Sequence, residues 1–477
     1  MATAPQPSPT FSEAIDSSTL LSWVILRTFS QLMSLSAVLC VGANSHGQLG
    51  QAHTQDQLVP QNATLTTTVL LQLTGGGGHS IALTRDGSLH TCGSNSCGQL
   101  GTGGKDDVHV FSLVQFPTPV SVREVTAGWD FSLAVTENGA LYSWGNNTFY
   151  QLGRQTSDKI SPHPGLVQTE LTTGVRMVAV AAGLRHALAL SEDGSVYGWG
   201  QNKRGQVGLA ASRDGKQEAK IPRPDLPVGV RPVQIAAGAN HSGFLTDSGS
   251  VYMWGCNRFG QTSQDPSQTT QLTDPCCIPA SVFSGVQVRH IACGWTHNLA
   301  VSALDQVYSW GRADYGQLGR SCDQSCDPTP KVVERLGKVH AVACGSEHNL
   351  AVTDDGNLYS WGWNEHGMCG TGNESNVPLP VQVSVQAEHY KSVYIGPGSC
   401  GDLESVEKCF FEVSPQLLAV RMVRGIRCGH TLEVFTPSFF EWSAEKVLPE
   451  QVEIHWNMGK RKSTQFSGEK SKAHATE

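Results

Sequence analysis

The chain has 477 residues, of which 51 are glycine, 39% are hydrophobic and only 16% are charged. Its net charge of −8 at pH 7 argues against electrostatic binding to nucleic acid, because such binding needs a basic surface. Fourteen cysteines are scattered along the sequence without a CxxC pair or the histidine spacing of a zinc site. We therefore expect reduced thiols and no bound metal.

Residues 1–37 lie outside the pattern that fills most of the chain. The stretch 19–41 is apolar enough to be tested as a membrane or signal segment. An acidic residue, Glu13, precedes it where a signal peptide carries basic residues, and Arg27 interrupts it. We predict an atypical N-terminal extension, helical or irregular, and no membrane insertion.

From residue 38 to residue 435 one phrase recurs about seven times, with clear copies at AGWDFSLAVTENGALYSWGNN and ACGSEHNLAVTDDGNLYSWGWN. Two alternating apolar and polar runs in each copy flank a tight turn such as Asp-Gly, which is typical of a β-hairpin. A shorter apolar run precedes the hairpin and a polar connector follows it, so each unit predicts four antiparallel strands. The glycines that end the VYxWG phrase or its variants are spaced by 51 to 56 residues, at Gly42, Gly93, Gly145, Gly200, Gly255, Gly311 and Gly362.

Such a period predicts an all-β fold, a seven-bladed β-propeller, because a four-stranded sheet with two apolar faces must stack on neighbours to bury them. The chain enters at LCVGANSHGQLG, the back half of a unit, while RCGHTLEVF near the other end is a front half. We expect strands from both ends of the array to close the ring and leave no open sheet edge.

The last repeat departs from the period. Its histidine is due near positions 399 to 404 but appears at His430. We therefore predict an insertion at about 395–424 in the last blade, within a propeller domain that spans 38–435. Residues 436–477 are polar and predict a flexible C-terminal tail.

We interpret the repeated tryptophans and histidines first as residues that stabilise the fold. The tryptophan of the VYxWG phrase should pack between blades. The histidine of the GxxH phrase should tie turns together by hydrogen bonds, because one histidine per blade leaves them too far apart to cooperate in catalysis. These positions are Trp144, Trp199, Trp254, Trp310 and Trp361, and His79, His186, His241, His297 and His348, with Phe131 replacing the histidine of the second unit.

Turns alternate between the two ends of an antiparallel sheet, so the GxxH turn and the loop after VYxWG should share one face. The two residues inside GxxH vary while their frame is constant, which favours a protein-binding face. Alternatively, Trp129 and Trp295 fold over the hub of the ring. The candidate partner-binding residues are Trp129, Arg185, Asn240, Trp295, Thr296, Arg312, Asp314, Tyr315, Trp363 and Glu365.

These phrases resemble the regulator of chromosome condensation repeat, a propeller family whose founding member is the nucleotide exchange factor for the Ran GTPase. Strings such as TGGGGHS, WGRADYGQLGR and SWGWNEHGMCG are similar to a vertebrate member that acts in protein secretion. The resemblance implies a guanine nucleotide exchange factor or regulator of a small GTPase. Mapped by motif onto the position before the repeat histidine, it implies Asp130 and Glu347 as the catalytic acids.

Two other functions stay open. One is a scaffold that uses the same face to bind a component of the secretory tethering (exocyst-type) machinery without exchange activity. The other is a propeller enzyme, although the sequence offers no convergent acid, base or metal set. We expect a monomer with no cofactor of its own, in the cytoplasm and in the nucleus as well.

Overall fold

The computed structural model describes residues 37–65, 70–170, 172–210, 216–221, 229–383, 390–396, 408–413, 442–443 and 455–456. The chain divides into two units, residues 1–417 and 418–477, and each is described by itself. In the second unit β29 (Trp442–Ser443) pairs antiparallel with β30 (His455–Trp456). The predicted N-terminal extension lies outside the described residues except for Ala37, and so does His430.

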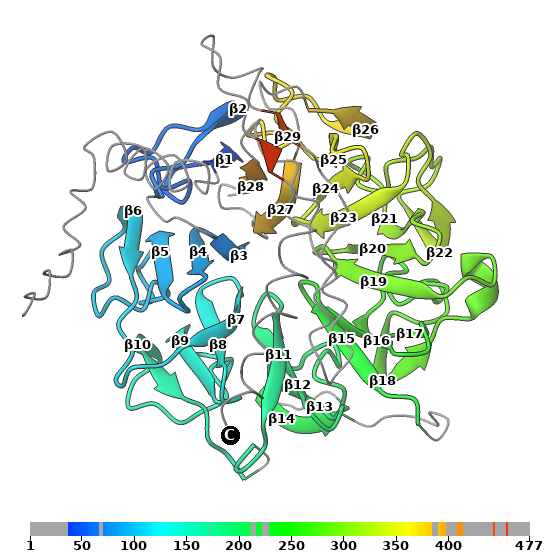
Figure 1. Cartoon of the computed structure of the whole chain (residues 1–477). Coiled ribbons are helices and arrows are strands. Elements are labelled where there is room, and N and C mark those ends of the chain that lie inside the picture. Colours follow the sequence, from blue (N-terminus) through cyan, green and yellow to red (C-terminus); the bar gives the residue numbers. More distant parts are fainter. Residues whose placement is uncertain are drawn as a thin grey trace, which may run out of the picture. The chain divides into compact units, whose positions relative to one another are not determined.

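Six four-stranded antiparallel sheets in the first unit are each built from one continuous segment, and we number them as blades one to six (Figure 1). Blade one holds β3 (Leu70–Gly75), β4 (His79–Thr84), β5 (Leu89–Gly93) and β6 (Val108–Leu113). Blade two holds β7 (Val122–Ala127), β8 (Phe131–Thr136), β9 (Leu141–Asn146) and β10 (Ile160–Leu166). Blade three holds β11 (Met177–Ala182), β12 (His186–Ser191), β13 (Val196–Gln201) and β14 (Lys216–Ile221).

Blade four holds β15 (Pro232–Ala237), β16 (His241–Thr246), β17 (Val251–Cys256) and β18 (Gln271–Cys277). Blade five holds β19 (Val288–Cys293), β20 (His297–Ser302), β21 (Val307–Arg312) and β22 (Cys326–Val332), and a short 3-10 helix, η1 (Ala280–Phe283), precedes it. Blade six holds β23 (Val339–Cys344), β24 (His348–Thr353), β25 (Leu358–Gly362) and β26 (Val377–Gln382). None of the described residues form a helix long and apolar enough to span a membrane.

The all-β propeller is confirmed, but the predicted count of seven blades is corrected to six continuous blades and one composite sheet. The repeat that ends at Gly42 has no blade of its own, because β1 (Ala37–Gly42) and β2 (Gln57–Asn62) supply only two strands. Two strands cannot bury a sheet face alone. They are completed by β28 (Lys408–Val413) and β27 (Tyr390–Gly396), in the order β2-β1-β28-β27.

The half units at the two ends of the array therefore meet in one sheet, but the closing strands are not those around His430. Strand β27 begins at Tyr390, one repeat length after β23 begins at Val339. The array thus keeps its period to this point, and β27 and β28 both fall within or beside the segment 395–424 that the sequence marked as an insertion. The innermost strands contact one another in cyclic order, β3 to β7, β11, β15, β19, β23, β27 and back to β3.

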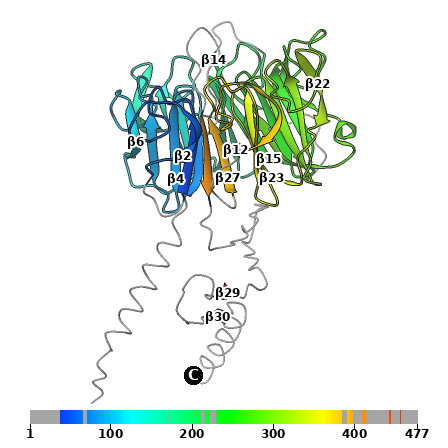
Figure 2. The same ribbon diagram turned by 90° about the horizontal axis from the view of Figure 1, so that it is seen from above.

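Burial follows the position of each strand within its blade. The second strand of every continuous blade is buried along its whole length, as in β12, while the outermost strand β6 has no buried residue. Seen from the side, the strands run between the two faces of the ring (Figure 2). The repeated tryptophans Trp144, Trp199, Trp254, Trp310 and Trp361 are at most 1% exposed. Trp254 of blade four packs in one cluster with Leu188 of blade three, so the predicted packing between blades is confirmed.

A repeated hydrogen-bond latch joins successive blades. The backbone carbonyl of Gln261, in the GQTS turn of blade four, accepts the indole N–H of Trp310 at 3.1 Å and the side-chain amide of Asn298 at 2.8 Å, both from blade five. The Oδ1 of Asn298 lies 2.8 Å from Nε2 of His241, the repeat histidine of blade four. Gln99, Gln206 and Gln317 accept equivalent pairs of bonds from their neighbouring blades. The predicted role of the repeat histidines as ties between turns is confirmed at these latches.

The exception at Phe131 has a matching exception in the next blade. His79, His186, His241 and His297 each contact a serine or asparagine in the next blade, such as Ser132 opposite His79. Opposite Phe131 that position is Ala187, and the two side chains pack in one apolar cluster. The indole of Trp199 still donates to the Gln151 carbonyl at 2.9 Å. A polar pair has thus been exchanged for an apolar pair of complementary shape.

The latch at Gln261 predicts the effect of removing its central residue, Asn298. Asn298→Ala removes the acceptor for His241 and one donor to Gln261, both in a fully buried site, and should lower the free energy of unfolding by about 1–3 kcal/mol. Asn298→Ser, which installs the residue found at Ser132 and Ser242, is the matched control and should lose less. Urea unfolding of both variants measures the difference. Equal stability of Asn298→Ala and the native chain would contradict the latch.

A second prediction concerns the contact between blade six and the composite sheet. Nδ1 of His366 lies 3.0 Å from Oδ2 of Asp56, and this bond raises the pKa of His366 above its usual 6.5. Burial alone would raise the pKa of Asp56, but the hydrogen bonds from His366 and from the Asn44 N–H, together with the charge of His366, outweigh it and lower that pKa. The contact should therefore stabilise the fold at pH values below the ordinary histidine pKa and fade as pH rises through the raised pKa.

Comparison with His366→Gln tests this pH dependence. The side chains are 27% and 37% exposed, so solvent screening limits the stabilisation to below about 1 kcal/mol. The native chain should exceed the variant in melting temperature at pH 5.5 by more than it does at pH 9. A difference that is constant over this range, or that grows toward pH 9, contradicts the assigned protonated pair.

Candidate functional site

The turn that carries GxxH and the loop that follows VYxWG are joined in each continuous blade, and together they form one face, which we call the GxxH face. In blade two the N–H of Asn146 donates to the carbonyl of Asp130 at 2.9 Å. Gly145 lies between them with φ +105°, and a Cβ there would approach the Asp130 carbonyl to 2.6 Å. Glycine is therefore required to bring the two loops together. Equivalent bonds join Gln201 to Arg185, Cys256 to Asn240, Arg312 to Thr296 and Trp363 to Glu347.

A belt of backbone hydrogen bonds ties the GxxH turns of successive blades around the hub. In blades one to five the first residue inside GxxH donates its N–H to the carbonyl of its counterpart in the next blade, at 2.8 to 3.3 Å. The belt runs through Gly77, Trp129, Leu184, Ala239, Trp295 and Ser346. The side chains of the face are thus presented from a backbone whose own donors are satisfied from Gly77 to Trp295 along this belt.

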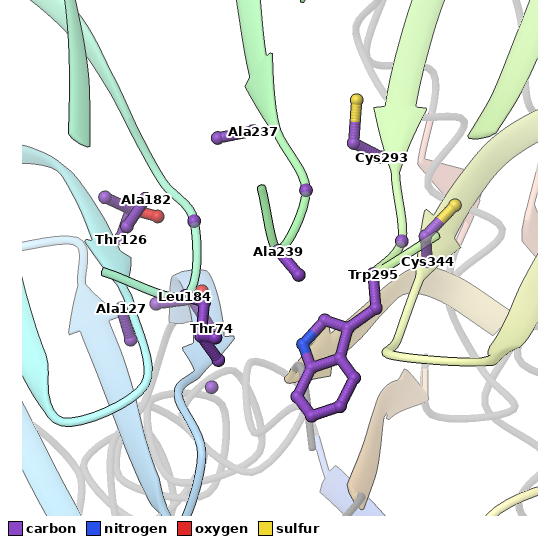
Figure 3. A pocket seen from close by; sticks show the side chains of 14 residues that line it. Thr74, Thr126, Ala127, Ala182, Leu184, Ala237, Ala239, Cys293, Trp295 and Cys344 are labelled. Carbon is purple, nitrogen blue, oxygen red and sulfur yellow. The ribbon is translucent and has the colours of Figure 1, made fainter. Parts of the chain in front are cut away.

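Trp129 and Trp295 contact each other across the hub, with ring centroids 6.1 Å apart and planes tilted by 52°. Trp295 is only 8% exposed, so in the free chain it is no protruding anchor for a partner. It instead borders a cavity of about 140 Å³ at the mouth of the central channel (Figure 3). The geometry matches the alternative in which this tryptophan folds over the hub.

Asp130 is half-buried beside a cation and two amides. Its Oδ2 accepts the Asn146 amide at 2.7 Å, and Oδ1 lies 3.4 Å from the Gln151 amide. Burial raises the pKa of Asp130, and the hydrogen bond from Asn146 and the charge of Arg185 only partly offset this. The Arg185 guanidinium lies 4.9 Å from the centroid of the Phe149 ring. The Asp130 carboxylate is therefore held in place by hydrogen bonds and by a nearby positive charge. No close ion pair with a described residue neutralises it.

Glu347 has a different environment, because it is 1% exposed and surrounded by donors. Its Oε1 accepts the Thr296 hydroxyl at 2.7 Å and its Oε2 accepts the Gln317 amide at 2.6 Å. The Arg312 guanidinium is 3.6 Å from Oε1, and His297 Nδ1 is 3.8 Å from Oε2. Glu347 is thus positioned to orient Thr296 and Arg312, and reaching a partner would break these contacts.

Arg312 is fixed on the face by charge and by aromatic rings. Its Nε donates to Asp314 at 2.7 Å, and its guanidinium lies 4.7 Å from the Tyr315 ring centroid and 4.9 Å from that of Phe259. Burial alone would lower the pKa of Arg312, but the bond to Asp314 and the charge of Glu347 outweigh it and raise the pKa. A planar cation held between two rings is pre-organised for binding, because little side-chain entropy remains to be lost.

The remaining predicted residues extend this cluster or stand apart from it. Trp363 lies 6.3 Å from Tyr315 and 6.3 Å from His366 between ring centroids, and it is 8% exposed. Glu365 next to it is exposed. Asn240 accepts the Gln206 amide at 3.3 Å in a separate part of the face. The structure therefore joins Thr296, Arg312, Asp314, Tyr315, Trp363 and Glu347 into one group.

Sequence reasoning missed a basic arc on the same face. Lys203 and Arg204 follow strand β13, Arg258 follows β17, and Arg185 lies in the adjacent GxxH turn. Lys203 and Arg258 are exposed, and neither they nor Arg204 form an ion pair with any residue the structure describes. The signal was present in the phrases QNKRGQVG and CNRFGQTS. They place Lys203 and Arg258 where other repeats have serine, threonine or an acidic residue, and Arg204 where other repeats have an aromatic residue, histidine or cysteine.

The chemistry available on the face is that of binding. Burial lowers the pKa of His186 to about 3 and those of His241 and His297 to about 4, so these repeat histidines are neutral at pH 7 and committed to latches. Within the described ranges no three histidine, cysteine or acidic side chains come together as a metal site. The face thus offers a pre-organised arginine, a half-buried carboxylate, a basic arc and aromatic rings.

Comparison with known proteins identifies the family. The model of the RCC1-like domain matches residues 37–401. The secretion-regulating guanine nucleotide exchange factors of Mus musculus and Bos taurus are 37% and 36% identical over 81% and 80% of this chain, and the alignments cover 86% and 85% of those proteins. The crystal structure of yeast RCC1 (Prp20) bound to Kap60 superimposes with a TM-score of 0.68 at 25% identity, covering 87% of this chain and 96% of that one. The chain therefore belongs to the RCC1-like domain family.

Proposed function

We propose that this protein regulates a small GTPase, as a guanine nucleotide exchange factor, and that it acts in protein secretion from the cytoplasm. The observation that carries the proposal is the 36–37% identity, over four fifths of the chain, to two proteins named as secretion-regulating exchange factors. The GxxH face supplies the binding surface, since it gathers a fixed cation, aromatic rings and a carboxylate on a rigid ring. No cofactor of its own is needed, because the nucleotide belongs to the GTPase.

Exchange by such a face is differential binding: the nucleotide-free GTPase must be held more tightly than its loaded form. Asp130 suits a direct part in this step. It is half-buried, burial raises its pKa, and the Asn146 amide holds it in place at 2.7 Å. A carboxylate brought against the nucleotide site competes for the contacts that phosphate and magnesium make. Glu347 contributes by fixing Arg312 and Thr296 in their binding positions.

A scaffold that holds a component of the secretory tethering machinery is the second candidate. One observation favours it: both predicted catalytic carboxylates already accept hydrogen bonds within the chain. A face whose acids are internally satisfied can bind a partner without displacing its nucleotide. The two functions share a surface and differ in the partner that it binds and in whether nucleotide exchange follows.

The test is release of labelled GDP from purified small GTPases, including Ran and secretory Rab, Ral and Rho types, with and without this protein. Acceleration of at least about tenfold on one GTPase is expected, which corresponds to lowering the barrier by about 1.4 kcal/mol. Asp130→Asn should reduce that acceleration while binding persists, and Glu347→Gln should weaken binding as Arg312 loses its orientation. Binding without acceleration on any GTPase supports a scaffold, and no binding to any GTPase removes the exchange-factor proposal.

Charge reversal locates the surface. The triple variant Lys203→Glu, Arg204→Glu and Arg258→Glu should slow association with the bound GTPase by about tenfold or more at low salt, because steering by a charged face is lost. The matched control reverses Arg85, Arg231 and Lys338, exposed cations on or beside the opposite turns, and changes net charge equally. If the control slows association as much as the test variant, the GxxH face is not the binding surface.

A further inference from the structure

The cavity at the mouth of the central channel has the features of a binding site (Figure 3). It is lined by the ends of the innermost strands and by the GxxH turns that follow them, and its volume is about 140 Å³. Thr74 and Thr126 lie on one side, and Cys293, Trp295 and Cys344 on the other. The site belongs to the GxxH face and shares Leu184, Ala239 and Trp295 with the belt, but it is separate from the group around Arg312 and from the basic arc.

Trp295 supplies a donor that has no acceptor. Its side chain is 8% exposed, and Nε1 is buried without a hydrogen-bond partner. The five tryptophans of the VYxWG phrase each donate to a glutamine carbonyl, so the Trp295 indole is unlike them. Figure 3 shows its ring nitrogen on the cavity side. A buried donor without an acceptor is costly, which favours a ligand that brings an acceptor to this point.

The lining decides the charge of that ligand. Its described residues are glycine, alanine, leucine, threonine, cysteine and tryptophan, and none is acidic, basic or histidine. An ionised group entering the cavity would lose its hydration without gaining a counter-charge. The hydroxyls of Thr74 and Thr126 and the indole N–H instead suit an uncharged group that both accepts and donates hydrogen bonds.

The volume decides its size. An apolar cavity of about 150 Å³ holds one benzene-sized molecule, whereas sites for drug-sized ligands begin at about 300 Å³. A cavity of 140 Å³ therefore accommodates a single side chain and excludes a nucleotide or other cofactor.

We propose that the cavity receives one carboxamide side chain, asparagine or glutamine, from the protein bound on the GxxH face. Its amide oxygen accepts the N–H of Trp295, and its amide group meets the threonine hydroxyls. The inference rests on the proposed function in one respect, that a partner occupies this face. The hydrogen-bonded belt fixes the backbone of Trp295 at the rim of the cavity, so the indole N–H is already in place when the side chain inserts.

Propionamide is the probe for the free chain, and propionate is its charged control of similar shape. The eleven tryptophans give separate indole N–H signals by NMR, and the Trp295→Phe variant identifies the relevant one. Propionamide should shift that signal in a saturable way, while propionate at equal concentration should not. Ala237→Val, which narrows the cavity and leaves the indole in place, should weaken the propionamide response.

Three outcomes would overturn the inference: an indole signal that propionamide leaves unchanged, equal responses to propionate, or an unaltered propionamide response in Ala237→Val. A folding defect in Trp295→Phe is recognised from its melting temperature, and Ala237→Val then decides. With a GTPase that binds, Trp295→Phe should raise the dissociation constant roughly threefold to tenfold, the size of one net hydrogen bond. If no GTPase binds, the proposed exchange function fails, but the propionamide titration still tests whether the cavity binds a carboxamide.

Discussion

The interaction on which the rest of the structure depends is the latch at the glutamine carbonyl of each GQLG-type turn. At five of these turns that single oxygen accepts an indole N–H, and at four of the five it also accepts a serine or asparagine side chain from the next blade, as at Gln99 and Gln317. Because the turn belongs to the same loop that carries Arg312 or Lys203, fixing the carbonyl also fixes the loop. Blade packing and presentation of the candidate site are therefore one constraint. Where the polar latch is reduced, at Phe131 and Ala187, apolar packing replaces it.

Much of this could be predicted from the sequence, because repetition exposes what each position must do. The spacing of VYxWG indicated the sheets, the tryptophans indicated packing between blades, and strand parity placed the GxxH turn and the following loop on one face. The bonds from Asn146 to Asp130 and from Trp363 to Glu347 agree with that placement. The composite closing sheet also followed from the half units at the ends. Its two C-terminal strands were predicted too far along the chain, around His430. The prediction relied on the repeat histidine, which β28 lacks, whereas the spacing of the strands leads to Tyr390.

Other features depend on three-dimensional contacts that no repeat pattern contains. Glu347 and Asp130 occupy equivalent sequence positions, yet one is enclosed by Thr296, Gln317 and Arg312 while the other is half-buried beside Arg185. Trp295 reads as an exposed hot spot in the sequence, but the narrow hub leaves it only 8% exposed, at the wall of a cavity. These differences divide the face into a rigid cluster around Arg312, a basic arc and an uncharged central cavity. A partner that contacts all three regions is recognised by its charge, by contacts with aromatic rings and by one side chain that inserts into the cavity.

The central claim is that one rigid face, formed by the GxxH turns and the loops after VYxWG, binds the partner. Hydrogen exchange with and without a bound GTPase tests it most directly, because the two faces lie on separate peptides of every blade. Slowed exchange should appear in the loops at 146–152, 202–208, 257–262, 312–318 and 363–368, with the Asp-Gly type turns at 85–88, 137–140 and 192–195 unchanged. Protection concentrated in those turns, or spread evenly over both faces, would contradict the account.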